Sequence, residues 1–238
     1  MKILTWNCNG AFRKKAYLID DLELDIYIIQ ECENPKIYSK EYKERETNYL
    51  WKGNNKNKGL GIFAKDNIKL KMLDWSDKNY KYKNEELELF LPCLVNEQFI
   101  ILAVWTKHAN SEVFGYIGQL WKYLQLHKNK LKEYPCFVIG DFNSNKIWDK
   151  WDRWWNHSDV VKELEEIDII SFYHHLNNEK QGEEKNPTFY LQRKLEKAYH
   201  IDYIFGTKKL LKKETKCKIL NESKWIEVSD HLPLMLNI

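Results

Sequence analysis

The stretch CFVIGDFNS at residues 136–144 is the segment that best indicates the fold of this chain. Its first five residues are apolar or small, and Pro135 ends the preceding element, so we expect a short, fully buried strand over 136–140. Asp141 and Asn143 follow where that strand ends. Catalytic groups are often placed on such loop ends, because the sheet behind them is rigid.

Polar side chains of the same kinds stand at the ends of other apolar runs. They are Asn7 after 2–6, Glu31 after 26–30, Asp202 within 201–205, and Asp230 with His231 before 233–238. Acidic oxygens are the ligands that Mg²⁺ or Mn²⁺ prefers, and a nearby histidine can transfer a proton. Each residue alone is more often solvated, salt-bridged or a turn former. The inference therefore rests on the combination.

Apolar runs and helical patterns alternate along the whole chain. Further strands are expected at 59–64, 86–91, 99–106 and 216–220, helices at 14–22, 112–131 and 158–166, and polar connectors at 52–58 and 74–84. No internal repeat and no Pro/Ser-rich linker interrupts them. This alternation predicts one α/β domain over residues 1–238 with mixed sheets.

The composition sets broad limits on the class of protein. The 238 residues are 43% hydrophobic and 14% aromatic, which argues against disorder, and the net charge of +3 is compatible with an anionic partner without identifying one. The five cysteines are scattered with no CxxC pair, so we expect neither disulfides nor a zinc site. With no signal peptide or membrane span expected, the prediction is a cytoplasmic monomer without an obligate protein partner.

Five segments resemble the endonuclease/exonuclease/phosphatase family, whose members include exonuclease III and DNase I. They occur in the family's order: TWNCNG at 5–10, QE at 30–31, GDFNS at 140–144, HIDYIF at 200–205 and SDHLPL at 229–234. Only His200 departs from the usual pattern, because the family more often has arginine there. The resemblance implies a four-layer α/β/β/α sandwich of two mixed sheets flanked by helices.

The resemblance also implies roles, residue by residue. Glu31 would be the main ligand of a Mg²⁺ or Mn²⁺ ion, Asp230 would support the metal region, and Asn7 would fix Glu31 or contact phosphate. Asp141 would position or deprotonate the attacking water, and Asn143 would hold water or a phosphate oxygen. His231 would face the scissile phosphate, oriented by Asp202. Which of Asp141 and His231 activates the water stays open.

Four further residues have a weaker basis. His108 follows the strand at 99–106, where several branches of the family have a His or Tyr near phosphate; it could equally be a surface-loop histidine. His200 either contacts phosphate or packs in its strand. Trp151 belongs to WDKWDRWWNH at 148–157, where helical spacing favours packing for most tryptophans and nucleobase stacking for one. Lys208 opens a lysine-rich run that either meets a phosphate backbone or is solvated surface.

The implied activity is metal-dependent hydrolysis of phosphodiester bonds, with DNA or RNA as the expected substrate. A phosphatase or phosphodiesterase acting on a phosphoinositide, sphingomyelin or a small nucleotide would use the same residues. A member that binds nucleic acid without cutting it is the third alternative. It is disfavoured because the chain has kept every residue of the expected catalytic set.

Overall fold

Two mixed six-stranded sheets form the centre of the molecule. The computed structural model describes residues 1–42, 48–75, 87–108 and 113–238. The first sheet has the order β13-β14-β1-β2-β4-β3. β1 and β2 are parallel and every other neighbouring pair is antiparallel. Its strands are β1 (Lys2–Asn7), β2 (Ile26–Cys32), β3 (Tyr49–Asn55), β4 (Lys58–Ala64), β13 (Lys216–Ile219) and β14 (Leu234–Asn237).

The second sheet has the order β5-β6-β7-β8-β12-β9. Only β7 and β8 run parallel in it, which leaves the carboxyl end of β8 beside that of β7 and the start of β12. Its strands are β5 (Leu70–Met72), β6 (Phe90–Val95), β7 (Phe99–Trp105), β8 (Cys136–Asp141), β9 (Ile169–Ser171) and β12 (Asp202–Thr207).

The two sheets pack face to face, and alternation along each strand divides its side chains between two cores. In β7, Ile101 and Ala103 face the other sheet, while Leu102 and Val104 belong to a second core on the outer face. In β1, Ile3 points between the sheets, whereas Leu4 and Trp6 lie in a third core outside the first sheet. The chain therefore has three stacked apolar layers.

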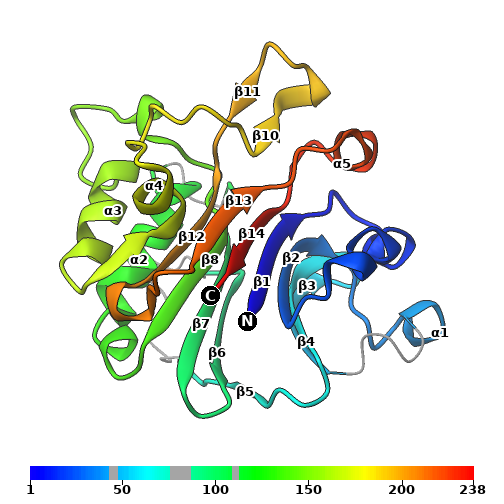
Figure 1. Ribbon diagram of the computed structural model, residues 1–238. Coiled ribbons are helices and arrows are strands. Elements are labelled where there is room, and N and C mark those ends of the chain that lie inside the picture. The colour runs from blue at the N-terminus through cyan, green and yellow to red at the C-terminus, as the bar shows by residue number, and fades with distance from the viewer. Residues whose placement is uncertain (43–47, 76–86, 109–112) are drawn as a thin grey trace.

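Helices cover both outer faces, which completes the predicted four-layer sandwich (Figure 1). α2 (Ile117–His127) and α3 (His157–Glu165) lie over the second sheet, with α4 (Phe172–Asn177) beside β12. α5 (Ser223–Val228), α1 (Ser39–Tyr42) and the 3-10 helices Phe12–Lys14 and Ala16–Leu22 flank the first sheet. Shorter 3-10 helices occupy Lys130–Lys132, Lys146–Trp148, Leu191–Arg193 and Lys208–Leu210. None of the described helices is long and apolar enough to cross a membrane.

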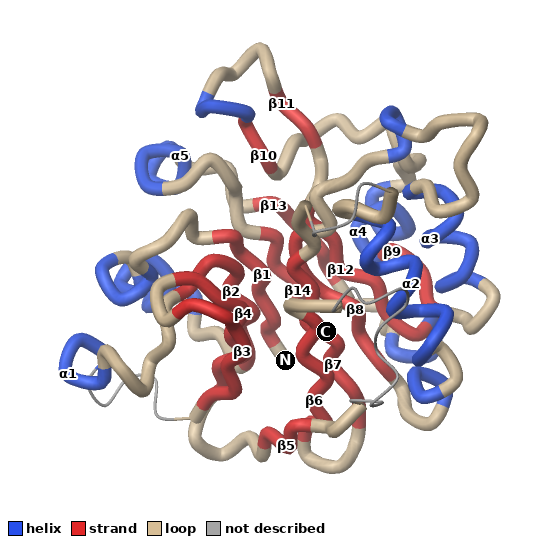
Figure 2. Tube along the Cα trace, turned by 180° about the vertical axis from the view of Figure 1, so that it is seen from behind, coloured by secondary structure: helices blue, strands red, loops and turns tan. Residues whose placement is uncertain are grey.

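A small hairpin rises from one end of the sandwich (Figure 2). It consists of β10 (Phe189–Tyr190) and β11 (Ala198–Tyr199), paired antiparallel. A bridge between Phe189 and His231 joins the hairpin to the segment before β14. The same end receives the last residues of β1, β2, β7 and β8 and the first of β12, so this end of the sandwich collects the polar strand-end residues.

Some expected elements are placed differently. The strand expected at 86–91 is β6, Phe90–Val95, and Glu86 lies outside the described residues. Proline is disfavoured inside sheets because it cannot donate a ladder hydrogen bond. β6 nevertheless runs through Pro92, whose carbonyl oxygen accepts from the backbone of Leu73.

The expected helix at 112–131 and connector at 52–58 also need correction. The helix α2 covers only Ile117–His127, because the chain then turns into the separate 3-10 helix Lys130–Lys132; Glu112 lies outside the described residues. The segment 52–58 is not a loop, since β3 continues to Asn55 and β4 starts at Lys58. Polar residues are tolerated there because β3 is an edge strand.

Gly140 lies where the backbones of β7 and β8 approach each other closely. Its φ is +147°, and a Cβ built on it would lie 1.8 Å from the carbonyl oxygen of Val104. We expect Gly140→Ala to lower the free energy of unfolding by about 3 kcal/mol or more, from overpacking and backbone strain together. Urea denaturation measures this. Gly115→Ala is the control, because its Cβ would meet nothing closer than 3.7 Å; equal stability of the two variants would contradict the prediction.

Candidate active site

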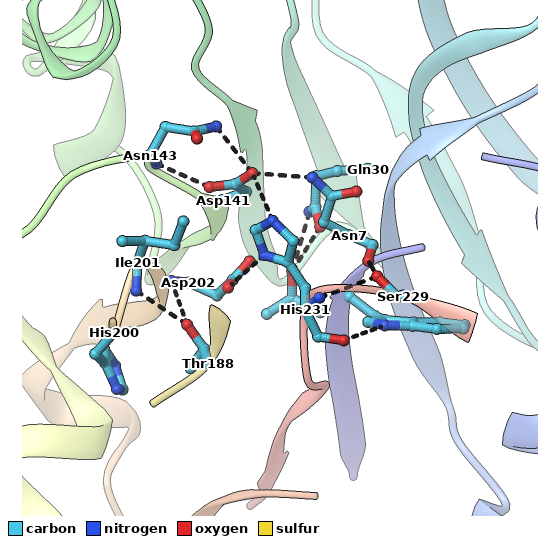
Figure 3. A network of polar contacts seen from close by, with 12 residues as sticks. Asn7, Gln30, Asp141, Asn143, Thr188, His200, Ile201, Asp202, Ser229 and His231 are labelled. Carbon is cyan, nitrogen blue, oxygen red and sulfur yellow. Dashed lines mark hydrogen bonds and ion pairs between the residues drawn. The ribbon is translucent and has the colours of Figure 1, made fainter. Parts of the chain in front are cut away.

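Residues from both sheets converge at the end of the sandwich that carries the hairpin (Figure 3). Asp141 ends β8 and is the register partner of Asp202, the first residue of β12. Asn7 ends β1 in the other sheet, and His231 lies just before β14. The sequence therefore correctly placed these four side chains at strand ends, and the packing of the sheets brings them together.

Asp141 is the centre of the hydrogen-bond network. Its Oδ2 accepts from Asn7 Nδ2 at 3.0 Å and from Asn143 Nδ2 at 2.9 Å, and its Oδ1 accepts from the backbone N–H of Asn143 at 2.8 Å. Complete burial raises the pKa of Asp141 to about 7, against the opposing attraction of the nearby His231. A carboxylate with this pKa is suited to accept a proton near neutral pH.

His231 and Asp202 form a buried pair beside Asp141. His231 Nδ1 lies 2.9 Å from Asp202 Oδ2, and its Nε2 lies 3.9 Å from Asp141 Oδ2. Burial would lower the pKa of His231, but the charges of Asp202 and Asp141 outweigh it and raise that pKa to about 9. These charges favour the imidazolium form, with Nδ1 fixed by Asp202 and Nε2 directed to the Asp141 side.

Glu31 is directed towards this network by a backbone irregularity. The register between β2 and β4 shifts between Gln30 and Cys32, and Glu31 is the extra residue, with a φ of +62°. A bulge of this kind re-aims a side chain. Glu31 Oε1 lies 3.4 Å from Asn7 Nδ2, and its Oε2 lies 2.5 Å from the ammonium of Lys58.

Asn143 also adopts a left-handed backbone conformation, with a φ of +44°. Its Nδ2 donates to the carbonyl oxygen of Thr106 at 2.8 Å as well as to Asp141. Both amide hydrogens are thus used by acceptors, which fixes the orientation of the amide and leaves Oδ1 as its remaining polar atom. Non-glycine residues at positive φ are uncommon and concentrate at functional sites.

Two hydroxyl groups that we did not predict as site residues hold the network in place. Thr188 Oγ1 accepts from the backbone N–H groups of Ile201 and Asp202 at 2.9 and 3.0 Å. Ser229 Oγ donates to the carbonyl oxygen of Asn7 at 2.7 Å and accepts from the N–H of His231. The signal for Ser229 was its place in SDH at 229–231. Thr188 gave no sign beyond its place in the PTFY stretch at 187–190 that precedes HIDY.

The oxygen-rich donor set fits a hard divalent cation. Among the described residues, polar atoms of Asp141, Asp202 and His231 all lie within 4.8 Å of one another. Both ring nitrogens of an imidazolium are hydrogen-bond donors, so the two carboxylates are the groups of this cluster that could ligate a cation. Asp202 Oδ1 is buried and has no hydrogen-bond partner within the described parts of the chain. Glu31, the expected metal ligand, reaches this cluster through the shared amide of Asn7.

Two expected site residues lie at the margin of the network. Asp230 is half-buried; its carbonyl oxygen accepts from the N–H of Tyr190, and its negative charge contributes to the raised pKa of His231. His108 is exposed, and its ring lies 5.9 Å from that of Tyr116. It is two residues beyond Thr106, whose carbonyl oxygen accepts from Asn143, so His108 lies at the same end of the sheet as the network.

The structure separates His200 and Lys208 from the cluster. His200 points away from it in Figure 3, and its Nδ1 donates to the carbonyl oxygen of Asn186 at 3.1 Å. It is buried against Tyr173 and Tyr203, so of the two sequence interpretations the packed one describes its position. Lys208 follows the far end of β12, six residues from Asp202 and thus roughly 20 Å away.

The tryptophan-rich segment does not form the helix that its spacing indicated. A 3-10 helix ends at Trp148 and α3 begins only at His157. Trp155 is buried with its ring 4.6 Å from that of Phe114, and Trp148 packs on Tyr199 at 5.0 Å. Trp151, in contrast, is 98% exposed.

A second buried polar network lies behind the loop that carries Asn143. The carboxylate of Glu184 accepts from His174 Nε2, from Asn145 Nδ2 and from the N–H of Gly182. Despite its burial, these hydrogen bonds lower the pKa of Glu184 to about 2, so it is ionised. Because Asn145 lies two residues beyond Asn143, this network anchors the loop from the side away from the cluster.

Comparison with known families gives one match, which covers nearly the whole chain. The sequence model of the Endonuclease/Exonuclease/phosphatase family matches residues 4–231. A search of curated proteins found no significant match.

Solved structures share the fold at low sequence identity. An AP endonuclease from Archaeoglobus fulgidus superposes with a TM-score of 0.72 at 16% identity, covering 100% of this chain and 99% of its own. The 3'-5' exonuclease NExo from Neisseria meningitidis gives 0.69 at 16% identity, with 100% and 99% covered. The APE2 catalytic domain of Xenopus laevis gives 0.70 at 15% identity, with 100% and 91% covered. At these identities the likeness establishes the fold.

Two buried histidines near the second network make stability depend on pH. Burial lowers the pKa of His157 and of His200 to about 4, below the value near 6.5 of an unfolded chain. Between those values only the unfolded chain takes up these protons, so each histidine makes the free energy of unfolding fall as the pH drops from about 6.5 to about 4. We expect His157→Gln and His200→Gln to lose less stability over this range than the parent protein.

Urea denaturation at several pH values measures this slope. All other titrating groups are shared by the proteins compared, so a changed slope belongs to the replaced histidine. His175→Gln is the matched control, because His175 is exposed on the same helix as His174. A slope unchanged from the parent protein in both test variants would contradict the prediction.

Proposed function

The chain belongs to the Endonuclease/Exonuclease/phosphatase family, and from this we propose that it is a divalent-metal-dependent hydrolase of phosphodiester bonds acting on DNA or RNA. The observation that carries the proposal is the buried contact between a carboxylate of raised pKa, Asp141, and the His231–Asp202 pair. Asp141 can accept the proton of an attacking water, and the His231–Asp202 pair can stabilise the charge on a phosphoryl group.

Asp141 and Asn143 are proposed to hold and activate the water. The Oδ1 of Asn143 remains free to accept after both of its amide hydrogens are donated. Water donates hydrogen bonds and phosphate oxygens do not, so Asn143 is suited to hold the water rather than the phosphate. Asp141, bonded to the same amide, takes the proton of that water.

His231 is proposed to contact the phosphoryl oxygens. Its imidazolium Nε2–H is the polar atom of this ring that Asp202 does not occupy. Asp202 holds the ring in place, and Thr188 in turn holds the start of β12 through two backbone N–H groups. Preorganised donors of this kind stabilise the developing charge without further reorganisation.

Glu31 is proposed as the main ligand of a Mg²⁺ or Mn²⁺ ion, with Asp230 supporting the region. When bound, such an ion neutralises and orients the phosphoryl oxygens. Asn7 donates to both Glu31 and Asp141, so its amide is proposed to fix the two carboxylates relative to each other. His108, exposed beyond Thr106, is proposed to approach the leaving group.

An aromatic row supports nucleic acid as the substrate class. Phe189 lies 4.6 Å from the His231 ring and pairs with Tyr199, on which Trp148 packs. Beyond Trp148 along the chain, Trp151 is 98% exposed, so its ring is open to a ligand. Nucleobases stack on such side chains irrespective of sequence. Proteins that share this fold include an AP endonuclease, a 3'-5' exonuclease and the 3' phosphatase NExo bound to a product DNA hairpin, so abasic and 3'-phosphorylated DNA belong among the substrates to test.

We further propose that residues 1–238 act as one catalytic domain, as a monomer in the cytoplasm. All five cysteines are buried and free. This suits a reducing compartment, where structural disulfides are rare.

Activity should depend on metal and on the two carboxylates. A panel of plasmid, single-stranded, abasic and 3'-phosphorylated DNA, RNA, a phosphoinositide and bis-p-nitrophenyl phosphate is assayed with Mg²⁺, Mn²⁺ or EDTA. We expect EDTA to abolish nucleic-acid cleavage, and Asp141→Asn to lower kcat by about 10²–10⁴-fold, the usual contribution of a general base. Glu31→Gln should lose several orders of magnitude of activity.

The outcomes separate the alternatives. Cleavage of the lipid or the generic ester alone would keep the chemistry and overturn the choice of substrate. Turnover on no substrate with either metal would favour the non-catalytic alternative. Near-parental rates for Glu31→Gln would exclude its role as a ligand.

Trp151→Ala should weaken nucleic-acid binding by about 5–100-fold, the worth of one stacked base, while kcat at saturation stays unchanged. Fluorescence anisotropy with a labelled single strand measures the affinity. Tyr17→Ala is the control, because Tyr17 is 60% exposed in the 3-10 helix outside the first sheet. Unchanged affinity of Trp151→Ala would assign Trp151 to the solvated surface.

A further inference from the structure

Lys58 lies directly against the proposed metal ligand Glu31. It is the first residue of β4, and the register pair Cys32–Gly59 puts it beside the bulge that carries Glu31. Its ammonium is 2.5 Å from Glu31 Oε2, while Asn7 lies against the other oxygen. The carboxylate of Glu31, which is the proposed metal ligand, is therefore already paired with a basic side chain.

The environment lets this ion pair form and break. The Lys58 side chain is 51% exposed and that of Glu31 is 18% exposed, so the lysine is reachable by solvent whereas the carboxylate is largely enclosed. A lysine carries a compact charge on a flexible stem, and its ammonium can turn to another acceptor without disturbing the backbone. Phosphate oxygens are acceptors of the same charge.

We propose that Lys58 is an exchangeable counter-ion of Glu31: it neutralises Glu31 when no divalent metal is bound, and it pairs with a substrate phosphate oxygen when the metal takes Glu31. The proposal rests on the proposed function, because it assumes a metal at Glu31. It assigns Lys58 a substrate-contacting role that the sequence motifs do not indicate.

The exchange predicts coupling between metal and substrate. Without substrate, the metal must displace or tolerate a neighbouring positive charge, which weakens its binding. With substrate present, the phosphate gives the ammonium a new partner and metal binding tightens. Because such coupling is reciprocal, metal must tighten substrate binding by the same factor.

The chain provides a matched control at the other end of the same strand. Lys65 directly follows β4 and pairs with Asp25 beside the start of β2 at 2.7 Å, with its side chain 48% exposed. The two lysines therefore have similar exposure and a similar acidic partner. Only Lys58 lies at the end of the sheets where the candidate site is.

The test is a titration of metal-free protein with Mn²⁺ by isothermal calorimetry. All variants carry Asp141→Asn so that an added single-stranded oligonucleotide stays intact. Without oligonucleotide, we expect Lys58→Gln to tighten Mn²⁺ binding by about 5–150-fold, the usual range of coupling between sites, and Lys65→Gln to leave it unchanged. With oligonucleotide, Mn²⁺ binding should tighten more in the protein that retains Lys58 than in Lys58→Gln, where only the direct contact between metal and phosphate contributes.

Glu31→Gln separates failure of this inference from failure of the proposed function. If Glu31→Gln does not weaken Mn²⁺ binding, the proposed metal site is wrong, and the inference falls with it. If it does, but Lys58→Gln binds Mn²⁺ as the Lys58 protein does, the function stands and the counter-ion role is overturned. Weaker Mn²⁺ binding in Lys58→Gln would also overturn it, because Lys58 would then help to build the metal site. Unchanged circular dichroism confirms that each variant is folded.

Discussion

The side-chain amide of Asn7 connects the two halves of the candidate site. Its Nδ2 lies within reach of Glu31 in its own sheet and donates to Asp141 in the other. An amide is short, so this bridge requires the ends of β1 and β8 to lie close enough for their side chains to meet between the sheets. The packing of Ile3 and Ile139 between the sheets is thus also what sets the distance between the two carboxylates. Substitutions in that core would affect the site by changing the distance between the two carboxylates, without changing any charge in the site.

The fold and the centre of the site were largely predictable from the sequence, because both depend on local patterns. Asn7 and Asp141 end apolar runs and Asp202 lies at the start of one, so these runs identify both the strands and the strand ends. The β-bulge at Glu31 and its contact with Lys58 were not predictable, since they depend on the register between β2 and β4. The position of Lys208 was also not predictable, because a lysine-rich run does not reveal which end of a strand it follows.

The network around Glu184 shows how a loop can be rigid without regular structure. The segment after Asn143 has little regular structure before α3, yet Asn145 is held by a buried carboxylate and by the carbonyl oxygen of His200. An ionised buried carboxylate requires all of its donors, because losing one leaves a charge unpaired in a medium of low polarity. The side of this loop that carries Asn143 is therefore kept in position by polar contacts on its opposite side.

The first sheet places the ends of the chain next to each other. β14 lies against β1, and Ser229 holds the carbonyl oxygen of Asn7 across a separation of 222 residues. During synthesis on the ribosome, β1 can therefore pair with β2 early, but with β14 only after every element between them has been made. His231 is made just before β14, so the candidate cluster of Asn7, Asp141, Asp202 and His231 is complete only after that part of the chain has been made.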